Sequence, residues 1–296
     1  MFLRRKLTVI ATVALLSTSL LAGCSSSGEN SNGGSNGGGT ATAAEVLANK
    51  NARAAISMII DKQAYCDVIL NNGSIPTSTF TPRGLAFDNG KDYTDLTEGM
   101  GYEYNEEQAK ELWEKAKEEV GFDTVEMELL TFDHDTGKRT GEYIQSELSD
   151  LEGLTVKVSN LPFKQKLERE TNGEFDLAFS GWGADYPDPL TYLSTMQTGN
   201  QFSNQVGYNS EEYNKLIEEA MKLPITEGYA KYAEAEKLML EDGYLAPINQ
   251  KAGAYLEKEY VSGIVNNSWG ADFTYTYADV NKDDKVLNLA TSSDIP

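Results

Sequence analysis

Cysteine and histidine are scarce in this chain of 296 residues, which has two cysteines and one histidine. Cys24 and Cys66 form no CxxC spacing and no histidine pair exists, so the sequence predicts no zinc motif. His134 stands alone in the polar stretch 133–137, where a metal site and a solvated loop residue are both open readings. We therefore expect no metal and no cofactor.

Positive charge is also in short supply, with 25 Lys and Arg against 46 Asp and Glu and a net charge of −21. Nucleic acids and anionic lipid surfaces are bound through basic patches, so this composition argues against both as ligands. The acidic surface could favour cationic ligands, or it could serve only to keep the protein dispersed.

A long apolar run occurs only at the start of the chain. Residues 4–6 are basic and residues 7–21 are largely apolar, a run shorter than the roughly 20 residues of a membrane span. We interpret residues 1–24 as a signal peptide. Its ending, Leu21-Ala22-Gly23-Cys24, resembles the lipobox of bacterial lipoproteins, in which Cys24 becomes the lipidated first residue. The alternative is an ordinary secretory signal with a chance cysteine.

The rest of the chain divides by composition. Residues 25–44 are rich in Gly, Ser and Asn and predict a flexible tether; the folded body is expected over 45–279 and a tail over 280–296. Apolar spacing predicts helices at 52–62, 64–70, 105–120, 140–149, 163–171, 189–196, 210–221 and 226–241. Alternating or short apolar runs predict strands at 125–131, 154–158, 175–180, 244–249, 254–256 and 261–265. This alternation indicates an α/β fold, a mixed sheet with helices on both faces.

The most informative stretch is SGWGADYPDP at 180–189, which follows the apolar run 175–179. A strand is expected to end in a glycine-flanked tryptophan, then an acid and a proline-stiffened turn. Glycines let another backbone approach closely, and the carboxylate of Asp185 can hold an amine. The pattern favours binding of a peptide backbone and its amino end over catalysis.

Four segments resemble the second lobe of family 5 extracellular solute-binding proteins, the peptide-binding lipoproteins of ABC importers. They are NARAAI with IDK at 51–62, the helix at 105–118, FDL with GWGADYPDP at 175–189, and YNSEEYNKLI at 208–217. The resemblance implies a lobe like those of type II periplasmic binding proteins. Family members have two lobes, and the first lobe is absent from its expected place. Residues 285–296 resemble the family's first mature strand, although a chance β-like tail is the alternative.

The resemblance also implies site roles. Asp185 would hold the ligand's ammonium group, while Gly181, Trp182 and Gly183 would offer the backbone edge. Without the resemblance, Asp185 could equally cap a turn. Trp182 could line a side-chain pocket or fill the core, and Tyr186 and Phe163 are weaker pocket candidates for which core packing is the alternative.

The expected function follows from the resemblance: a lipid-anchored peptide-binding component on the outer face of the bacterial cytoplasmic membrane, or its periplasmic side, working with ABC permease subunits. A truncated remnant that binds nothing is the first alternative. A secreted hydrolase is remote, because no P-loop or Ser-His-Asp pattern is present. We expect that the protein is not an enzyme.

Overall fold

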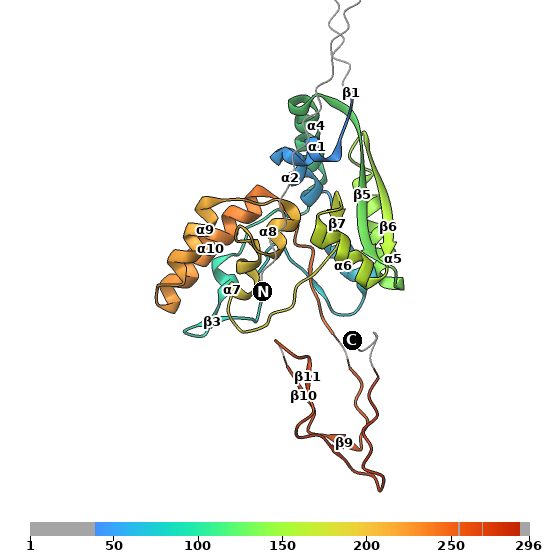
Figure 1. Cartoon of the computed structure of the whole chain (residues 1–296), viewed down its shortest axis with the longest axis vertical. Helices are drawn as coiled ribbons and strands as arrows, with labels where there is room; N and C mark the ends of the chain where they lie inside the picture. The colour runs from blue at the N-terminus through green and yellow to red at the C-terminus, as the bar shows by residue number, and fades with distance from the viewer. Residues whose placement is uncertain (1–38, 254, 268, 291–296) are drawn as a thin grey trace, which may run out of the picture. The chain divides into compact units, whose positions relative to one another are not determined.

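The computed structural model describes residues 39–253, 255–267 and 269–290, which belong to one compact unit (Figure 1). The α-helices are α1 (Ala43–Ala48), α2 (Lys50–Met58), α3 (Lys62–Ala64), α4 (Glu106–Val120), α5 (Asp135–Leu148), α6 (Phe163–Asn172), α7 (Leu190–Leu193), α8 (Gln201–Val206), α9 (Glu211–Ala220) and α10 (Ile225–Asp242). A π-helix, η1 (Tyr65–Leu70), follows α3, and 3-10 turns lie at η2 (Tyr93–Leu96) and η3 (Ser194–Met196).

The principal sheet has four strands, and every pairing in it is parallel. They are β1 (Gly39–Ala41), β5 (Phe122–Phe132), β6 (Leu154–Leu161) and β7 (Leu177–Ala178). β6 runs along all of the central strand β5 from Val125 onward. β1 pairs with the first part of β5 and β7 with residues 129–130 near its end. Antiparallel pairing is found in the short strand pairs outside this sheet.

The alternating pattern of β5 places its two faces in different surroundings. Val125, Met127 and Leu129 are buried, and α5 packs on the same face, where a Cβ at Gly141 would come within 2.6 Å of the Val158 side chain. On the other face, the Glu128 carboxylate pairs with Arg169 of α6 at 2.7 Å. Helices therefore cover both faces of the sheet, as predicted.

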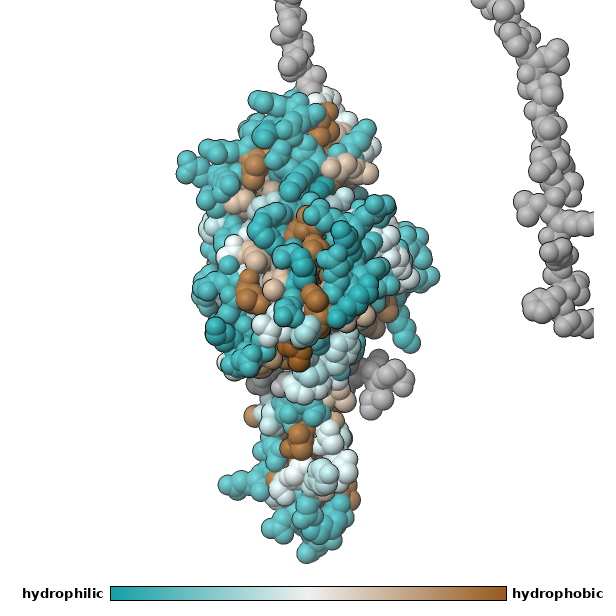
Figure 2. Space-filling model, turned by 90° about the vertical axis from the view of Figure 1, so that its left-hand side faces the viewer, coloured by the Kyte–Doolittle hydropathy of each residue, from teal (hydrophilic) through white to brown (hydrophobic). Residues whose placement is uncertain are grey.

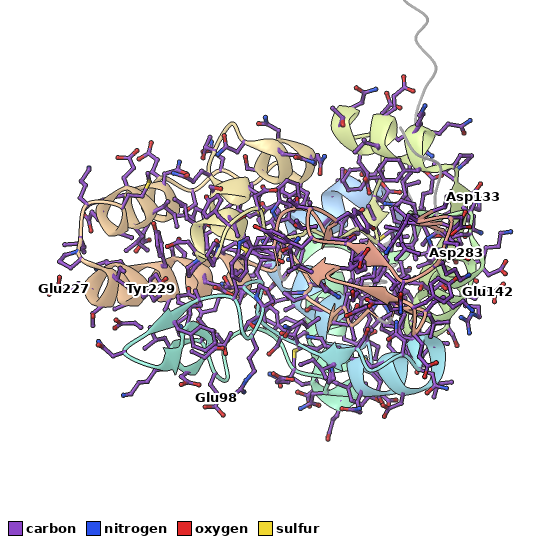
Figure 3. All side chains as sticks on the ribbon, turned by 90° about the horizontal axis from the view of Figure 1, so that it is seen from below. Glu98, Asp133, Glu142, Glu227, Tyr229 and Asp283 are labelled. Atoms are coloured by element: carbon purple, nitrogen blue, oxygen red, sulfur yellow. The ribbon has the colours of Figure 1, made fainter. Side chains whose placement is uncertain are left out.

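Two hydrophobic clusters hold these elements together. The first joins the sheet to α1, α2, α4 and α5, and its largest buried side chain is Trp113, whose indole N–H donates to the carbonyl of Glu152 at 2.9 Å. The second joins α7, α9 and α10 and is rich in tyrosine. Tyr229 of α10 meets Tyr93 edge to face at 5.6 Å in this second cluster. Figure 3 shows Tyr229 on the α10 side and Glu142 on the α5 side.

A buried carboxylate anchors the loop 77–100 to the second cluster. Glu236 of α10 is fully buried and accepts hydrogen bonds from the backbone N–H groups of Phe80 and Thr81, the Thr81 hydroxyl and the Tyr93 hydroxyl at 2.7–3.0 Å. Burial raises the pKa of Glu236, whereas these hydrogen bonds act in the opposite direction. Four donors thus replace the water that the carboxylate loses.

The surface around α9 and α10 is mostly hydrophilic, with small apolar areas between the charged side chains (Figure 2). The exposed apolar side chains at the turn between these helices are Met221, Leu223 and Ile225. Among the described residues, no helix combines the length and apolar character needed to cross a membrane.

Several predicted boundaries differ from the structure. The folded body includes residues 39–44, which precede its predicted start at 45: β1 pairs with β5, and Thr42 caps α1 in a capping box with Glu45. The composition of 25–44 hid this, because a strand of Gly, Thr and Ala carries no apolar alternation. α8 was missed, since its sequence QFSNQV has no apolar periodicity. α5 begins at Asp135, five residues before its predicted start.

The predicted strands near the end of the chain also need correction. The predicted strand 175–180 is reduced to β7, and 244–249 to β8 (Asn249–Gln250), which pairs with β2 (Ile75–Pro76). The predicted strand 254–256 is absent in its described residues 255 and 256. The remaining short strands are β3 (Phe87–Asp88), β4 (Lys91–Asp92), β9 (Val261–Ser262), β10 (Val265–Asn266), β11 (Phe273–Thr274) and β12 (Asp279–Val280).

The tail from 280 forms no strand among its described residues beyond Val280, so its likeness to a first strand finds no counterpart in residues 281–290. Residues 291–296 lie outside the described part. The signal peptide, Cys24 and most of the predicted tether also lie outside it.

Candidate functional site

The candidate site follows β7, where the chain leaves the carboxyl end of the parallel sheet. The Phe179 N–H donates to the Leu130 carbonyl at 2.9 Å, and the Phe179 ring packs edge to face on Tyr65 in the first core cluster. Ligands of open α/β sheets commonly bind outside the carboxyl ends of the strands. Phe179 anchors this exit, and residues 180–187 then run along the surface.

Gly181 and Gly183 are exposed, and the fold itself does not require a glycine at either position. A Cβ built on either residue would meet no atom within 4 Å, and neither has a positive φ. By contrast, Gly153 has φ +86° and its Cβ would lie 2.0 Å from the Asp123 carbonyl oxygen. Within the described residues, the N–H groups of Gly181, Trp182 and Gly183 donate no hydrogen bond to another protein group. The segment thus presents free donors beside open space.

Asp185 stands at the end of this edge with its backbone fixed and its side chain exposed. Its N–H donates to the Thr191 hydroxyl at 3.0 Å, and Thr191 is 3% exposed. Among the described residues, the Asp185 carboxylate has neither an ion-pair partner nor a hydrogen-bond donor within reach. The predicted turn-capping alternative would require such a donor, so the geometry leaves the carboxylate available to a ligand.

Trp182 is half-buried and is tied to the second core cluster. Its indole N–H donates to the Thr191 carbonyl at 2.9 Å, its ring meets Phe202 edge to face at 5.5 Å, and its carbonyl accepts from the Tyr192 hydroxyl at 3.2 Å. These contacts give the indole a packing role. Only the exposed part of the Trp182 ring is available to line a side-chain pocket.

Tyr186 and Asp188 complete the turn in different ways. Tyr186 is 42% exposed, and its hydroxyl pKa is raised, first by burial and then by the carboxylates of Asp188 and Asp185. Asp188 is half-buried and accepts from the Leu190 N–H at 2.9 Å, at the start of α7. Asp188 therefore has a local structural role, and burial raises its pKa.

Phe163 lies at the start of α6, with 64% of its side chain exposed, in a stack of aromatic rings. Its ring is parallel to that of Phe132 at 6.0 Å, and Phe132 stacks in turn on His134 at 5.5 Å. His134 accepts the Gly137 N–H through Nδ1 at 3.0 Å and so caps α5. In the described residues, no group of three or more potential ligands could hold a metal ion.

A buried polar triangle joins Phe163's neighbourhood to the glycine edge. Lys166 of α6 is completely buried, and its ammonium group donates to Glu170 and to the Ser180 hydroxyl, the latter at 2.6 Å. Ser180 donates in turn to Glu170. The ammonium group also lies 4.3 Å from the centre of the Phe132 ring. Burial lowers the pKa of Lys166, and the bond to Glu170 opposes that shift.

Among the described residues, a hydrogen bond joins the segment 184–185 to a later part of the chain. The Gly270 N–H, beyond the β10 strand, donates to the Ala184 carbonyl at 2.8 Å. This bond occupies an acceptor next to Asp185 but leaves the N–H groups of residues 181–183 free.

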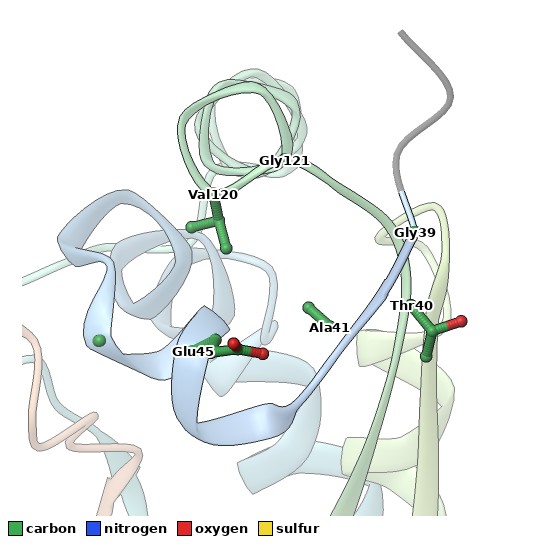
Figure 4. Close-up of a pocket in the computed structure, with 7 residues that line it drawn as sticks. Gly39, Thr40, Ala41, Glu45, Val120 and Gly121 are labelled. Atoms are coloured by element: carbon green, nitrogen blue, oxygen red, sulfur yellow. The ribbon is translucent and has the colours of Figure 1, made fainter. Parts of the chain in front are cut away.

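A separate hollow of about 490 Å³ lies between β1, α1 and the end of α4 (Figure 4). It contains none of the predicted site residues, and its one carboxylate, Glu45, is engaged by the Thr42 backbone and hydroxyl. The lining residues are Gly39, Thr40, Ala41, Glu45, Ala48, Val120 and Gly121. Its walls thus offer little chemistry for recognising a specific ligand.

The structure therefore brings together five of the predicted residues, 181–183, 185 and 186, on one exposed segment. Phe163 joins them only indirectly, through Phe132, Lys166 and Ser180. The sequence analysis missed Lys166, Glu170 and Thr191. A Lys and a Glu four residues apart on a helix are usually an exposed pair, so the sequence carried no sign of their burial.

The parallel sheet with helices on both faces agrees with the expected class, one lobe of a type II solute-binding fold. Comparison with known proteins agrees. The sequence model described as "Bacterial extracellular solute-binding proteins, family 5 Middle" matches residues 28–204. The chain belongs to this family.

Individual relatives agree with this assignment. A dipeptide-binding protein of Lactococcus lactis is 31% identical over 77% of this chain and 42% of its own. The substrate-binding domain of an oligopeptide ABC transporter from Bacillus anthracis has a TM-score of 0.76 and 34% identity. Listeria monocytogenes OppA bound to peptide has a TM-score of 0.74 and 36% identity. Both structures match 80% of this chain and 46% of their own. The chain thus spans less than half the length of these relatives, an extent consistent with one lobe.

Proposed function

We propose that this protein is the peptide-binding component of an ABC importer, or the part of such a component that binds the amino end of the peptide. The observation that carries the proposal is the edge 181–183 beside the carboxylate of Asp185, both without a partner among the described residues. Family membership and the peptide ligands named for its relatives point in the same direction.

The peptide backbone would be held as an added strand. Gly181 and Gly183 leave open space above the chain, and the N–H groups of residues 181–183 can donate to the carbonyl groups of an extended peptide. Main-chain hydrogen bonds of this kind are independent of the ligand's sequence. Side-chain preference then depends on the surroundings, to which Tyr186, Phe163 and the exposed part of Trp182 contribute.

The ligand's ammonium group would be held by Asp185. A charge-assisted hydrogen bond between an ammonium and a carboxylate is roughly twice as strong as a neutral one. The Thr191 hydroxyl fixes the backbone of Asp185, so little conformational freedom would be lost on binding. The net charge of −21 adds a weak, salt-dependent attraction for cationic peptides.

Cys24 would anchor the protein by lipid to the outer face of the cytoplasmic membrane, where it would deliver peptide to the permease subunits. Labelling of cells with an alkyne-bearing fatty acid tests the anchor. We expect label on the protein and its recovery with membranes, and loss of both in Cys24→Ser. An ordinary secretory signal would leave the protein unlabelled.

Binding is tested by calorimetry of the full chain against a pool of unblocked tri- to pentapeptides, with the same pool N-acetylated as control. We expect heat from the unblocked pool alone. Flat traces for both pools would favour the alternative of a non-binding remnant. Mass spectrometry of the recovered peptides tests the hydrolase alternative: our proposal requires that every peptide is recovered intact.

A further inference from the structure

The polar side chains of the buried triangle, Lys166, Glu170 and Ser180, all bond to one another. The Lys166 ammonium has three N–H donors, and its three neighbours are the Glu170 carboxylate, the Ser180 hydroxyl and the face of Phe132. The Ser180 hydroxyl accepts from Lys166 and donates to Glu170. Lys166 is fully buried and keeps no donor for a ligand.

The position of the triangle next to the edge 181–183 indicates a role other than direct contact with a ligand. Ser180 is the residue directly before Gly181, and its backbone is exposed while its hydroxyl is held between two side chains of α6. β7 ends at Ala178, so residues 180–183 have no strand partner in the described part. Thr191 braces residues 182–185, so without the triangle the added conformational freedom would be concentrated at Gly181, between Ser180 and Trp182.

Stability alone is a weak explanation for a buried ion pair in this place. Removing two charges from water costs free energy that their attraction often fails to recover, and apolar replacements of such pairs are frequently neutral or stabilising. Lys166 and Glu170 lie four positions apart on α6, and this spacing lets both side chains reach one hydroxyl on another segment. The arrangement therefore fixes the direction of the Ser180 hydroxyl as well as filling space.

We propose that Lys166 and Glu170 are positioning residues that act through Ser180 to hold the 181–183 edge in its peptide-accepting conformation. The same ammonium group lies against Phe132, on which Phe163 stacks, so the triangle also fixes the side of the site that α6 forms. The part of this inference that concerns peptide binding rests on the proposed function. The geometry of the edge can be tested without a ligand.

Three variants of the full chain separate positioning from general stability. Ser180→Ala removes the hydroxyl, Ser180→Thr keeps one, and Lys166→Met with Glu170→Leu replaces the pair by apolar groups of similar size. The matched control is Lys164→Met with Glu168→Leu, because these residues have the same types and spacing on the same helix but are exposed.

The ligand-free measurement is ¹⁵N relaxation at Gly181, because Gly183 lies between residues that Thr191 braces. We expect order parameters near 0.85 in the unmodified protein, in Ser180→Thr and in the control, and values below about 0.6 in the other two variants. Peptide Kd should rise about tenfold or more in the same two variants, while Ser180→Thr restores binding. If the Lys166/Glu170 variant does not fold, Ser180→Ala alone decides the question.

Unchanged order parameters in Ser180→Ala would overturn the proposal, even if stability fell. If no peptide binds the unmodified protein, the proposed function fails, but the relaxation data still decide whether the triangle orders the edge. A mobile Gly181 in Ser180→Ala together with an unchanged Kd would show that ordering has no role in binding, and would overturn the proposal in that respect.

Discussion

The amide of Asp185 donates a 3.0 Å hydrogen bond to the hydroxyl of Thr191, six residues later in the chain. Thr191 is buried, so the bond fixes the backbone at the point where an exposed carboxylate is presented. The Thr191 carbonyl accepts from the Trp182 indole as well. One threonine therefore braces both ends of the segment 182–185 against α7.

Replacing Thr191 should weaken peptide binding more than the accompanying loss of folding stability can explain. Thr191→Val removes the hydroxyl and keeps the shape, so we expect a loss of about 1 kcal/mol in the free energy of unfolding and a several-fold rise in peptide Kd. Thr191→Ser should restore the affinity because it keeps the hydroxyl. Urea unfolding and calorimetry measure the two effects, and equal affinities for the Val and Ser variants would contradict the bracing role.

Side chains added at Gly181 or Gly183 should block the ligand and leave the fold intact. A Cβ at either position meets open space, so Gly181→Val and Gly183→Val should change the free energy of unfolding by no more than about 0.5 kcal/mol. Peptide binding should be lost, because the added methyl groups occupy the space of the ligand's backbone.

Gly253 provides the matched control for these two variants, since its Cβ also meets nothing within 4 Å and its φ is not positive. Gly253→Val should bind peptide normally. Unimpaired binding by Gly181→Val and Gly183→Val would remove the edge from the site.

Lys62 should make stability rise with pH above about 8. Its side chain is 3% exposed and donates to the Tyr102 carbonyl, and burial lowers its pKa from 10.5 to about 8. Between these two values the unfolded chain binds more protons than the folded one, so deprotonation favours the fold. The contribution between pH 7.5 and 9.5 is on the order of 2 kcal/mol.

Cys66 acts in the opposite direction, because burial raises its pKa and the folded state then loses stability as the unfolded thiol ionises. The quantity to measure is therefore the difference between the protein and Lys62→Met, by urea unfolding at both pH values. The difference should grow with pH in favour of the unmodified protein. Lys115→Met, at an exposed site, should show no such trend, and a constant difference for Lys62→Met would refute the prediction.

Loss of the Glu236 carboxylate should strongly destabilise the second hydrophobic cluster and the loop 77–100 that it anchors. Glu236→Ala leaves two backbone N–H groups and two hydroxyls without their acceptor, at an expected cost of about 3–5 kcal/mol in the free energy of unfolding. Glu234→Ala, two residues away on an exposed surface, removes only an ion pair with Lys231 and should cost less than about 1 kcal/mol. Similar unfolding midpoints for the two variants would contradict this account.

The sequence predicted the helices that combine caps with apolar periodicity. α4, predicted over 105–120, begins after its cap Asn105 and ends before Gly121, whose φ is +83°. The sequence-based prediction failed where strand pairing decides the structure. β1 is a strand because β5 offers an unpaired edge, and no pattern in Gly39–Ala41 reveals this.

The site was predictable only in part. The contiguous segment 180–189 could be recognised because its glycines, acid and prolines lie together in the sequence. The groups that hold it, Thr191, Lys166 and Glu170, depend on how α6 and α7 pack against it, and their sequence pattern resembles an ordinary helix surface. The packing role of the Trp182 indole likewise follows from Thr191 and Phe202, which the sequence does not place beside it.

The central claim is that Asp185 holds a ligand's ammonium group. The most direct measurement is the Kd of Asp185→Asn, a variant with nearly the same shape, for one bound peptide in its unblocked and N-acetylated forms. The unmodified protein should prefer the unblocked peptide by at least about tenfold, and Asp185→Asn should lose that preference. An undiminished preference in Asp185→Asn would contradict the account.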